Sequence, residues 1–476
     1  MSAVLAIDQG TTSTRGFVTA PGGRLVPVFS RRHKQIHPRS GWVEHDPEEL
    51  VADLRACLDA AAAHDIVAVG LDNQGESCLG WDGATGEAVS PVIVWQDDRT
   101  LPETERLKGA GIESLTLSRA GLPLDPYFSA SKLAWVLRHV PNASSLARRG
   151  RLRLGTTDAY FRDRLTGRFE TDVTTASRTS LMNLRTCEWD GELCAAFGVP
   201  PECLPQITPC TGDLGGLKIG ANHVPLTASL VDQQAATYGH GCRLPGDAKI
   251  TFGTGAFAFA IIGAELPGEL HGCLPTVAWA RAGEAPVYAL DGGVYAAGSA
   301  VDWAGRLDLF DSLQDLEEFD VEPAIARGLA FVPALVGLAC PHWNRQARGA
   351  WLGINLGTTK CDLMQAVLEG IAFRMAEVIE AMSAVVPISA PISIDGGLSA
   401  NARFCSTLAD ALHRPLRISV DTELTALGTA MHAAEAAGLQ INIERKTRLV
   451  ASGGNFHPMR QKFKAALAAV EEYGRS

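Results

Sequence analysis

Several absences in the sequence exclude whole classes of protein. The longest apolar stretch lies around Phe257–Ile262 and is far shorter than the roughly 20 residues that a membrane-spanning helix needs. The 11 cysteines are scattered, with no CxxC pair and no Cys/His cluster at zinc spacing. We therefore expect reduced thiols and a cytoplasmic protein. No basic segment followed by a cleavage site precedes the first strand, so we expect no secretory signal.

Basic residues are fewer than acidic ones. The chain has 42 Lys and Arg against 53 Asp and Glu, a net charge of −11, which argues against a nucleic-acid partner. Neither the GxGxxG of dinucleotide-binding enzymes nor the GxxxxGK[ST] of P-loop proteins occurs, so a dinucleotide-dependent oxidoreductase is disfavoured. With 476 residues, 46% hydrophobic and 20% charged, the sequence predicts a globular α/β protein of two or three domains.

The most informative stretch is Val4–Val18, VLAIDQGTTSTRGFV. Its apolar start predicts a short buried strand that ends at Asp8 and turns at Gly10 into a returning strand. Hydroxyls, backbone N–H groups and the guanidinium of Arg15 suit a phosphate chain. We read Asp8 as a carboxylate without a basic neighbour, which suits hydrated Mg²⁺. An ordinary surface hairpin with a hydroxyl-rich turn is the alternative.

A second segment of the same kind lies in the other half of the chain. Lys249–Gly263, KITFGTGAFAFAIIG, again predicts a strand, a turn at Gly253-Thr254-Gly255 and a returning strand. Two such hairpins indicate a duplicated architecture, and hairpins that grip phosphates from both sides of a cleft resemble the actin-like ATPase fold. Arg243–Asp247 reads as a linker. We therefore expect two domains, 1–242 and 243–476.

Polar residues follow three further predicted strands. Asp72–Ser77 and Trp95–Arg99 come directly after apolar runs, and ligands bind at the carboxyl ends of strands in α/β sheets. Two such clusters favour a polar ligand pocket, although each alone could be a solvated loop. Asp232 follows Leu226–Val231 and heads a predicted helix. It is either a first-turn acid that stabilises the helix or, beside a substrate hydroxyl, a general base.

Three other stretches predict local structure. Asp46 and Pro47 predict a helix start, because they suit the N-cap and first-turn positions. Asp291–Trp303 predicts a glycine-rich turn that leads into a helix. Pro391–Leu412 predicts a strand, an Asp-Gly-Gly turn and a helix from about Asn401, an arrangement that lets backbone approach a flat ligand.

Ten ordered motifs resemble those of the FGGY family of carbohydrate kinases, and most of all the glycerol kinases within it. They lie between about residue 4 and residue 438 and read DQGTTSTR, GWVEHDP, VWQDDRT, DPYFSASK, ASRTSLMN, DQQAA, FGTGAF, ARGAWLG, DGGLSAN and TALGTA. The resemblance implies an α/β fold of two actin-like (ribonuclease H-like) domains with a cleft between them. It implies a substrate-binding N-terminal domain and an ATP-binding C-terminal domain.

The resemblance also implies a role for particular residues. Asp8 would hold Mg²⁺ through water, and Asp232 would be the catalytic base. The phosphates of ATP would contact Thr11, Thr12, Ser13, Arg15, Gly253 and Thr254. The rest of the nucleotide pocket would contain Gly298, Gly397 and Asn401. The substrate would be held by Glu76, Trp95, Tyr127, Asp232, Gln233 and Phe257.

One position departs from the glycerol kinase pattern. Those enzymes carry Asn-Gln-Arg-Glu-Thr where this chain has Asn73-Gln74-Gly75-Glu76-Ser77, so the arginine that donates to glycerol hydroxyls is replaced by Gly75. Losing such a donor costs about 1–3 kcal/mol. The space left predicts that the pocket accepts glycerol or a longer polyol or ketose, such as a tetritol, pentitol or pentulose.

The implied reaction is ATP-dependent phosphorylation of a terminal hydroxyl on a small polyol or sugar, with closure of the two domains excluding water. The resemblance leaves a homodimer open. A rival interpretation is an actin-like ATPase without a small-molecule substrate. It shares both hairpins but leaves the acid at position 232 and the polar strand ends unexplained.

Overall fold

The computed structural model describes residues 2–19, 24–312, 316, 322–421, 423–441, 446–454 and 456–475. The chain divides into two compact units, and it first passes from one to the other between Gly241 and Cys242. Two later segments, Thr276–Tyr288 and Glu423–Glu444, belong to the first unit. Each unit is therefore assembled from separate stretches of sequence.

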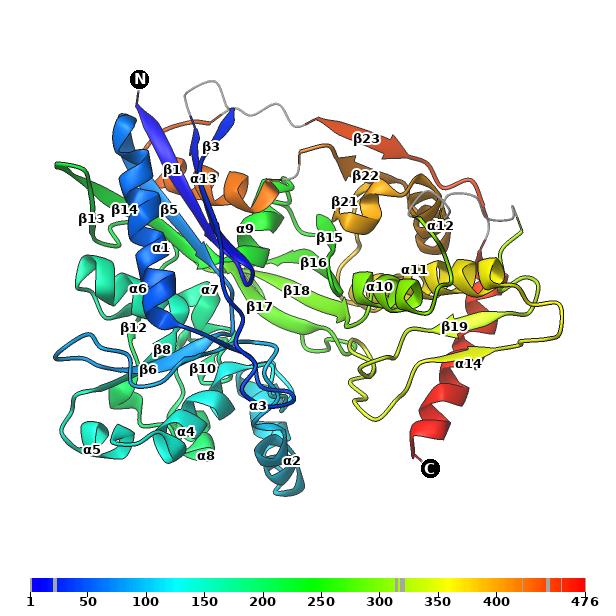
Figure 1. The fold of residues 1–476 in the computed structure, drawn as a ribbon, viewed down its shortest axis with the longest axis horizontal. Helices are drawn as coiled ribbons and strands as arrows, with labels where there is room; N and C mark the ends of the chain where they lie inside the picture. Colours follow the sequence, from blue (N-terminus) through cyan, green and yellow to red (C-terminus); the bar gives the residue numbers. More distant parts are fainter. Residues whose placement is uncertain are drawn as a thin grey trace. The chain divides into compact units, whose positions relative to one another are not determined.

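The first unit is organised around a six-stranded sheet (Figure 1). Its strands, in spatial order, are β13 (Gly216–Ile219), β14 (Asn222–Val231), β5 (Ile66–Asn73), β1 (Ala3–Gln9), β2 (Ser13–Thr19) and β3 (Leu25–Arg32). The hairpin strands β1 and β2 pair antiparallel, whereas β1, β5 and β14 run parallel. This register brings the carboxyl ends of β1, β5 and β14 to one edge of the sheet.

Helices cover both faces of this sheet. Helix α1 (Pro47–Ala60) packs on β1, β2 and β3, and α13 (Leu424–Ala436) packs on β1, β5 and β14. The alternation of strand side chains explains the two faces: Leu5 lies in the core with Leu50 and Leu54, whereas Ala6 packs with Ala426 and Ala430. Helix α1 begins as predicted, with Asp46 accepting a hydrogen bond from Glu48 N at 2.9 Å.

The rest of the first unit is built on a smaller four-stranded sheet. Its strands are β4 (Glu44–His45), β7 (Val92–Ile93), β6 (Cys78–Asp82) and β8 (Leu152–Thr156). Short pairs join β10 (Met182–Asn183) to β11 (Glu188–Trp189) and β12 (Gln206–Thr208) to β9 (Glu170–Asp172). The helices are α2 (Leu101–Gly109), α3 (Glu113–Arg119), α4 (Ser129–His139), α5 (Ala143–Arg148), α6 (Thr157–Thr166), α7 (Val173–Ala176), α8 (Gly191–Phe197) and α9 (Asp232–Gly239).

The second unit repeats the pairing pattern of the first. Its hairpin strands β15 (Ala248–Phe252) and β16 (Ala256–Gly263) are antiparallel, and β15 continues in parallel to β21 (Ile392–Gly396) and β22 (Leu416–Ser419). The antiparallel edge strand β23 (Thr447–Val450) follows β22. The same order of hairpin and parallel strands in both units agrees with the duplication that the two hairpin sequences predict.

The remaining elements complete the second unit and connect it to the first. Strands β17 (Leu274–Trp279) and β18 (Val287–Val294) carry the chain from the second unit to the first and back. Strands β19 (Ala330–Val332) and β20 (Ala350–Leu352) form a separate pair. The helices are α10 (Gly298–Arg306), α11 (Lys360–Val385), α12 (Ala402–Leu412) and α14 (His457–Arg475). No helix among the described residues has the length and apolar character needed to span a membrane.

One local prediction is wrong. Gly292 and Gly293 do not form a turn before α10 but lie inside β18. A Cβ atom at Gly292 would come within 2.8 Å of Val378 Cγ1 on α11. Glycine is needed there because the strand passes close to a packed helix, which the local sequence cannot reveal.

Candidate active site

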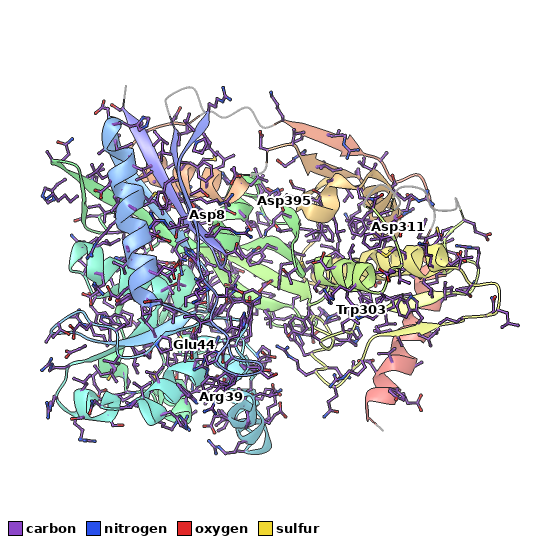
Figure 2. The ribbon with its side chains drawn as sticks, in the orientation of Figure 1. Asp8, Arg39, Glu44, Trp303, Asp311 and Asp395 are labelled. Carbon is purple, nitrogen blue, oxygen red and sulfur yellow. The ribbon has the colours of Figure 1, made fainter. Side chains whose placement is uncertain are left out.

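The tip of the first hairpin presents the hydroxyl-rich turn that the sequence predicts. Gly10 N donates to Ser13 O at 3.0 Å and closes the turn, which leaves Thr12 exposed and Thr11 half-buried. Figure 2 labels Asp8 near the end of β1. The strand register places Asp8 directly opposite Arg15 on β2.

Asp8 has a basic partner, contrary to the prediction from sequence. Arg15 Nη2 donates to Asp8 Oδ2 at 2.5 Å, and Nη1 donates to Glu423 Oε2 at 2.5 Å. Burial acts to lower the pKa of Arg15, but the carboxylates of Asp8 and Glu423 raise it above its ordinary value. The sequence interpretation overlooked that antiparallel pairing brings residues seven positions apart together across the hairpin.

A second carboxyl group, Asp72, lies at the end of β5 beside Asp8. It is fully buried, and Thr429 Oγ1 donates to its Oδ2 at 2.6 Å. Burial, followed by the charges of Asp8 and Asp232, raises the pKa of Asp72 well above its ordinary value. Three carboxyl groups therefore interact at this edge of the sheet.

Asp232 is the first residue of α9 and directly follows β14. The preceding residue, Val231, pairs with Asn73 at the end of β5, and Asp72 of β5 pairs with Asp8 of β1. Asp232 therefore lies at the same sheet edge as Asp8. Asp232 and Gln233 are half-buried, and Gln233 N donates to Asp232 Oδ1 at 2.6 Å. This placement suits either interpretation of Asp232, the first-turn acid or the general base.

Three predicted substrate residues lie together in the first unit. The rings of Trp95 and Tyr127 meet edge to face with centroids 5.6 Å apart. Arg178 Nε donates to Glu76 Oε1 at 2.6 Å, and the Arg178 guanidinium lies 5.8 Å from the Tyr127 ring centroid. Trp95 Nε1 donates to Thr11 Oγ1 at 2.9 Å. This last bond joins the predicted substrate residues to the predicted phosphate hairpin.

The polar loop after β7 contributes less to a pocket than the sequence suggests. Asp97 Oδ2 accepts hydrogen bonds from Val43 N and from Arg99 Nη2, both at 2.7 Å. Arg99 also donates to Glu44, labelled in Figure 2, and its guanidinium lies 3.9 Å from the Trp42 ring centroid. The side chains of Asp97 and Arg99 are therefore engaged with other buried protein groups, and Trp42 packs on Arg99.

The second hairpin has a tight turn that is held by the start of α10. Gly253 N donates to Gly255 O at 2.8 Å, and Thr254 is exposed. Gly298 N donates to Gly253 O and Ser299 N donates to Thr254 O, each at 3.0 Å. A Cβ atom at Gly298 would come within 2.5 Å of Gly253 O. The first N–H groups of α10 thus fix the shape of the turn.

The other predicted residues of the second unit lie on separate elements. Gly397 follows β21, and a Cβ atom there would meet no atom within 4 Å. The side chain of Asn401 caps α12, accepting from Phe404 N at 2.7 Å and donating to Leu316 O at 3.2 Å. Phe257 lies on β16, against Gly293 of β18. Their proposed contacts with nucleotide or substrate stay predictions.

Sequence reasoning missed Arg178, Glu423 and Thr429, and it named Asp72 only as a member of the polar cluster Asp72–Ser77. Asp72 was visible as an acid at a strand end, and Arg178 stands in the hydroxyl-rich TDVTTASRTSLMN. Glu423 and Thr429 contact residues more than 350 positions away in the sequence. No local pattern signals such a partner.

The donor chemistry at the sheet edge fits a divalent cation. The described residues contain no group of three His, Cys, Asp or Glu side chains arranged as a complete metal site. Mg²⁺ in phosphotransferases takes one or two carboxylates and completes its shell with water and phosphate oxygens. Asp8 and Asp232 provide such carboxylates at one sheet edge, and Arg15 carries a charge that suits phosphate.

Comparison with known proteins identifies the family. Residues 3–239 match the N-terminal domain, and residues 248–437 the C-terminal domain, of the FGGY family of carbohydrate kinases. The glycerol kinase of Citrifermentans bemidjiense is 40% identical over 451 residues, covering 92% of this chain and 91% of that protein. The glycerol kinase of Nocardia farcinica is 42% identical, covering 91% and 90%.

Solved structures agree with this result. A crystal structure of Plasmodium falciparum glycerol kinase with ADP superposes with a TM-score of 0.90 at 27% identity, covering 99% of this chain and 98% of that one. Xylulose kinase from Lactobacillus acidophilus has a TM-score of 0.85 at 22% identity, covering 99% and 98%, and shares the fold. The chain thus has the actin-like α/β fold of these kinases. It belongs to the FGGY family of carbohydrate kinases and is a phosphotransferase that acts on an alcohol group.

Proposed function

We propose that this enzyme transfers the γ-phosphoryl group of ATP to a terminal hydroxyl of glycerol or of a closely related small polyol. The observation that carries the proposal is the 2.9 Å hydrogen bond from Trp95 Nε1 to Thr11 Oγ1. It connects the aromatic residues proposed to hold the polyol with the hairpin proposed to hold the phosphates. The glycerol kinases that are about 40% identical over nine-tenths of the chain support the same substrate.

Asp232 is the general base in this proposal. It is half-buried at the start of α9, at the sheet edge that also carries Asp8. A carboxylate there accepts the proton of the substrate hydroxyl as the oxygen attacks the γ-phosphorus. Gln233, Glu76, Trp95, Tyr127 and Phe257 orient the polyol. An oriented hydroxyl contributes to rate because the entropy of alignment is lost on binding and not in the reaction step.

The first hairpin stabilises the transferred phosphoryl group. Thr11, Thr12 and Ser13 offer hydroxyl and backbone N–H donors, and Arg15 offers a guanidinium. Asp8 would hold a hydrated Mg²⁺, which neutralises phosphate charge when it is bound. Gly253 and Thr254 bind the phosphates from the second hairpin, while Gly298, Gly397 and Asn401 contact the rest of the nucleotide. Donors aimed at developing charge are the main source of rate in phosphoryl transfer.

The strand-end residue Gly75 favours a second candidate substrate. The glycerol kinases carry an arginine there, and this chain has no side chain at that position. A kinase for a tetritol, pentitol or pentulose would use the space that the arginine occupies. The neighbouring acid Glu76 is buried at 5% exposure, so one acid for hydroxyl recognition is retained in either case.

The test is a screen of the purified full-length protein for ADP release. Glycerol, dihydroxyacetone, erythritol, threitol, the pentitols and the pentuloses are each supplied with MgATP. We expect ADP release to depend on a polyol, with glycerol or a four- to five-carbon relative giving the highest kcat/KM. ATP consumption that is the same with and without every polyol would overturn the proposal and favour a substrate-free ATPase.

A further inference from the structure

The segment that follows β9 ends in a buried arginine at the proposed substrate site. Arg178 lies just beyond α7, and its Nε donates to Glu76 Oε1 at 2.6 Å. The side chains of both residues are almost completely buried, with 3% and 6% exposure. The guanidinium also lies 5.8 Å from the ring centroid of Tyr127 and 5.5 Å from that of Phe128. One side chain therefore contacts two of the residues proposed to bind the polyol.

The backbones of these two partners are held from a different direction. Ser129 Oγ, at the start of α4, donates to Glu76 O at 2.9 Å. Lys132 Nζ, one turn further along α4, donates to Tyr127 O at 2.9 Å. Hydrogen bonds to these carbonyl oxygens fix the backbone position of Glu76 and Tyr127 but not the direction of their side chains. The side-chain orientation of Glu76 depends on its bond to Arg178.

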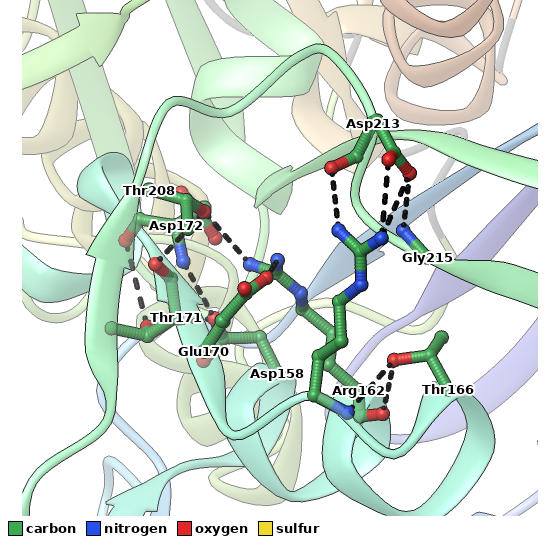
Figure 3. A network of polar contacts seen from close by, with 10 residues as sticks. Asp158, Arg162, Thr166, Glu170, Thr171, Asp172, Thr208, Asp213 and Gly215 are labelled. Atoms are coloured by element: carbon green, nitrogen blue, oxygen red, sulfur yellow. Dashed lines mark hydrogen bonds and ion pairs between the residues drawn. The ribbon is translucent and has the colours of Figure 1, made fainter.

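The base of the Arg178 segment is rigid. Figure 3 shows that Asp158 and Asp172 lie in one buried polar network, in which Asp158 Oδ2 accepts from Thr171 Oγ1 at 2.7 Å and from Asp172 N at 3.1 Å. Asp172 in turn caps α7 by accepting from Thr174 N at 2.8 Å and Thr175 N at 3.0 Å. Arg178 N then donates to Thr175 O at 3.0 Å. This buried network holds the backbone from which the Arg178 side chain extends.

Stability alone does not account for a buried ion pair at this place. Removing two charges from water costs several kcal/mol per ion, so such pairs are often no better than apolar residues of the same size. Their benefit is a fixed geometry. Gly75 contributes no side chain next to Glu76, so the cation bonded to this acid comes from Arg178, 102 residues further along the chain.

We propose that Arg178 is a positioning residue for polyol binding, which orients the Glu76 carboxylate and the Tyr127 ring toward the substrate hydroxyls. The proposal deepens the proposed function and depends on it. Glu76 Oε1 is taken by Arg178, so the acid is held in one rotamer with its other oxygen as the acceptor for a hydroxyl. Loss of Arg178 releases this rotamer, which weakens polyol binding and leaves the ATP-binding residues intact.

The experiment compares Arg178→Met and Arg178→Lys with the unchanged enzyme. Steady-state KM values are measured for the polyol that the screen selects and for ATP, and polyol binding is measured separately by calorimetry. We expect the polyol KM and Kd to rise about tenfold or more in Arg178→Met, the usual scale for a lost charge-assisted hydrogen bond. The ATP KM should change by less than about twofold. Arg178→Lys, which keeps the charge, should restore part of the affinity.

A matched control separates positioning from general stability. Arg374 on α11 is also almost completely buried and pairs with Glu377, but neither residue is proposed to touch substrate. Arg374→Met should lower the melting temperature without changing the polyol KM by more than about twofold. If the two variants shift the polyol KM equally, Arg178 has only a structural role.

A double variant tests whether Arg178 acts through its partner. In the double variant Glu76→Gln, Arg178→Met, the polyol KM should rise by less than the product of the two single effects. The second substitution removes a contact that the first has already weakened. Multiplicative effects, or an unchanged polyol KM in Arg178→Met, would contradict the inference. If both Arg178 variants fail to fold, Glu76→Asp breaks the same pair from the other side, and it should raise the polyol KM similarly. An unchanged enzyme that neither binds nor phosphorylates any polyol overturns the proposed function itself.

Discussion

Asp8 and Arg15 face each other across the first hairpin, and Arg15 Nη2 donates to Asp8 Oδ2 at 2.5 Å. The other amino group of Arg15 donates to Glu423 Oε2, so the guanidinium is oriented by two carboxylates. An arginine held in this way is preorganised for phosphate, because its side chain loses little conformational entropy when ATP binds.

Replacing Arg15 should therefore damage the use of ATP more than the binding of polyol. In Arg15→Met we expect kcat/KM for ATP to fall about tenfold or more, the scale of a lost hydrogen bond to a charged group. The polyol KM should change little. Steady-state kinetics with each substrate varied in turn measure both effects. Arg31→Met is the matched control. Arg31 lies on the neighbouring strand β3 and pairs with Asp53 of α1 at 2.6 Å, and it is not proposed to bind ATP.

The residue at position 75 should control substrate size. Gly75→Arg restores the side chain that the glycerol kinases carry, and a Cβ atom there lies 3.3 Å from Val231 Cγ1, a contact that a small side-chain shift relieves. We expect the ratio of kcat/KM for glycerol over that for a four- or five-carbon polyol to rise about tenfold or more. Gly75→Ala adds the same Cβ without a donor and should leave this ratio unchanged. An unaltered ratio in Gly75→Arg would mean that the residue at position 75 does not determine substrate selectivity.

Gly428 should be intolerant of any side chain. It lies on α13 where this helix crosses α9, and a Cβ atom would come within 1.8 Å of Ala235 O and 2.7 Å of Ala235 C. These are backbone atoms and cannot rotate away. Gly428→Ala should lower the free energy of unfolding by about 3 kcal/mol or more, as measured by urea denaturation. Gly109→Ala on α2, where a Cβ meets nothing within 4 Å, should change it by less than about 1 kcal/mol.

The stability of the protein should fall in mild acid because of a buried histidine. Burial, followed by the nearby charge of His33, lowers the pKa of His45 to about 4. The unfolded chain binds a proton near pH 6.5 and the folded chain does not, so this contribution is complete above pH 6.5 and is lost as the pH falls toward 4. The loss for His45 is about 3 kcal/mol.

Urea denaturation of the protein and of His45→Gln at pH 7 and pH 4.5 measures this effect. The variant should lose less stability between the two pH values than the parent does, whatever its stability at pH 7. His33, whose ring centroid is 5.8 Å from that of His45, also has a pKa lowered by burial and contributes in the same direction. Equal losses in parent and variant would show that His45 is not the group that titrates.

Local signals made much of the fold predictable. Asp46 and Pro47 define the start of α1, and the apolar runs with glycine turns define both hairpins. These features depend on neighbours in sequence, where capping and turn chemistry act. The two hairpins together predicted the duplicated architecture, and the ordered family motifs implied the actin-like fold. Gly292 and Gly293 were misread because their close neighbours are distant in sequence: Gly292 packs against Val378 of α11, and Gly293 packs against Phe257 of β16.

The sequence singles out candidate site residues but not the hydrogen bonds between them. Asp8, Arg15, Glu76 and Asp232 stood out as polar residues at strand ends, but their partners did not. The Asp8–Arg15 pair follows from hairpin register and could have been found in the sequence. Arg178 bonded to Glu76, and Thr429 bonded to Asp72, depend on tertiary packing. Local sequence patterns cannot predict such pairs.

The central claim is that Asp232 accepts the proton of the substrate hydroxyl, and single-turnover kinetics of Asp232→Asn test it most directly. The amide occupies the same space but cannot accept that proton, so the rate of phosphoryl transfer should fall at least about 100-fold. Calorimetry should show ATP and polyol affinities within about threefold of the parent, and Asp59→Asn, an exposed change on α1, should have no effect. A transfer rate in Asp232→Asn equal to that of the parent would contradict the account.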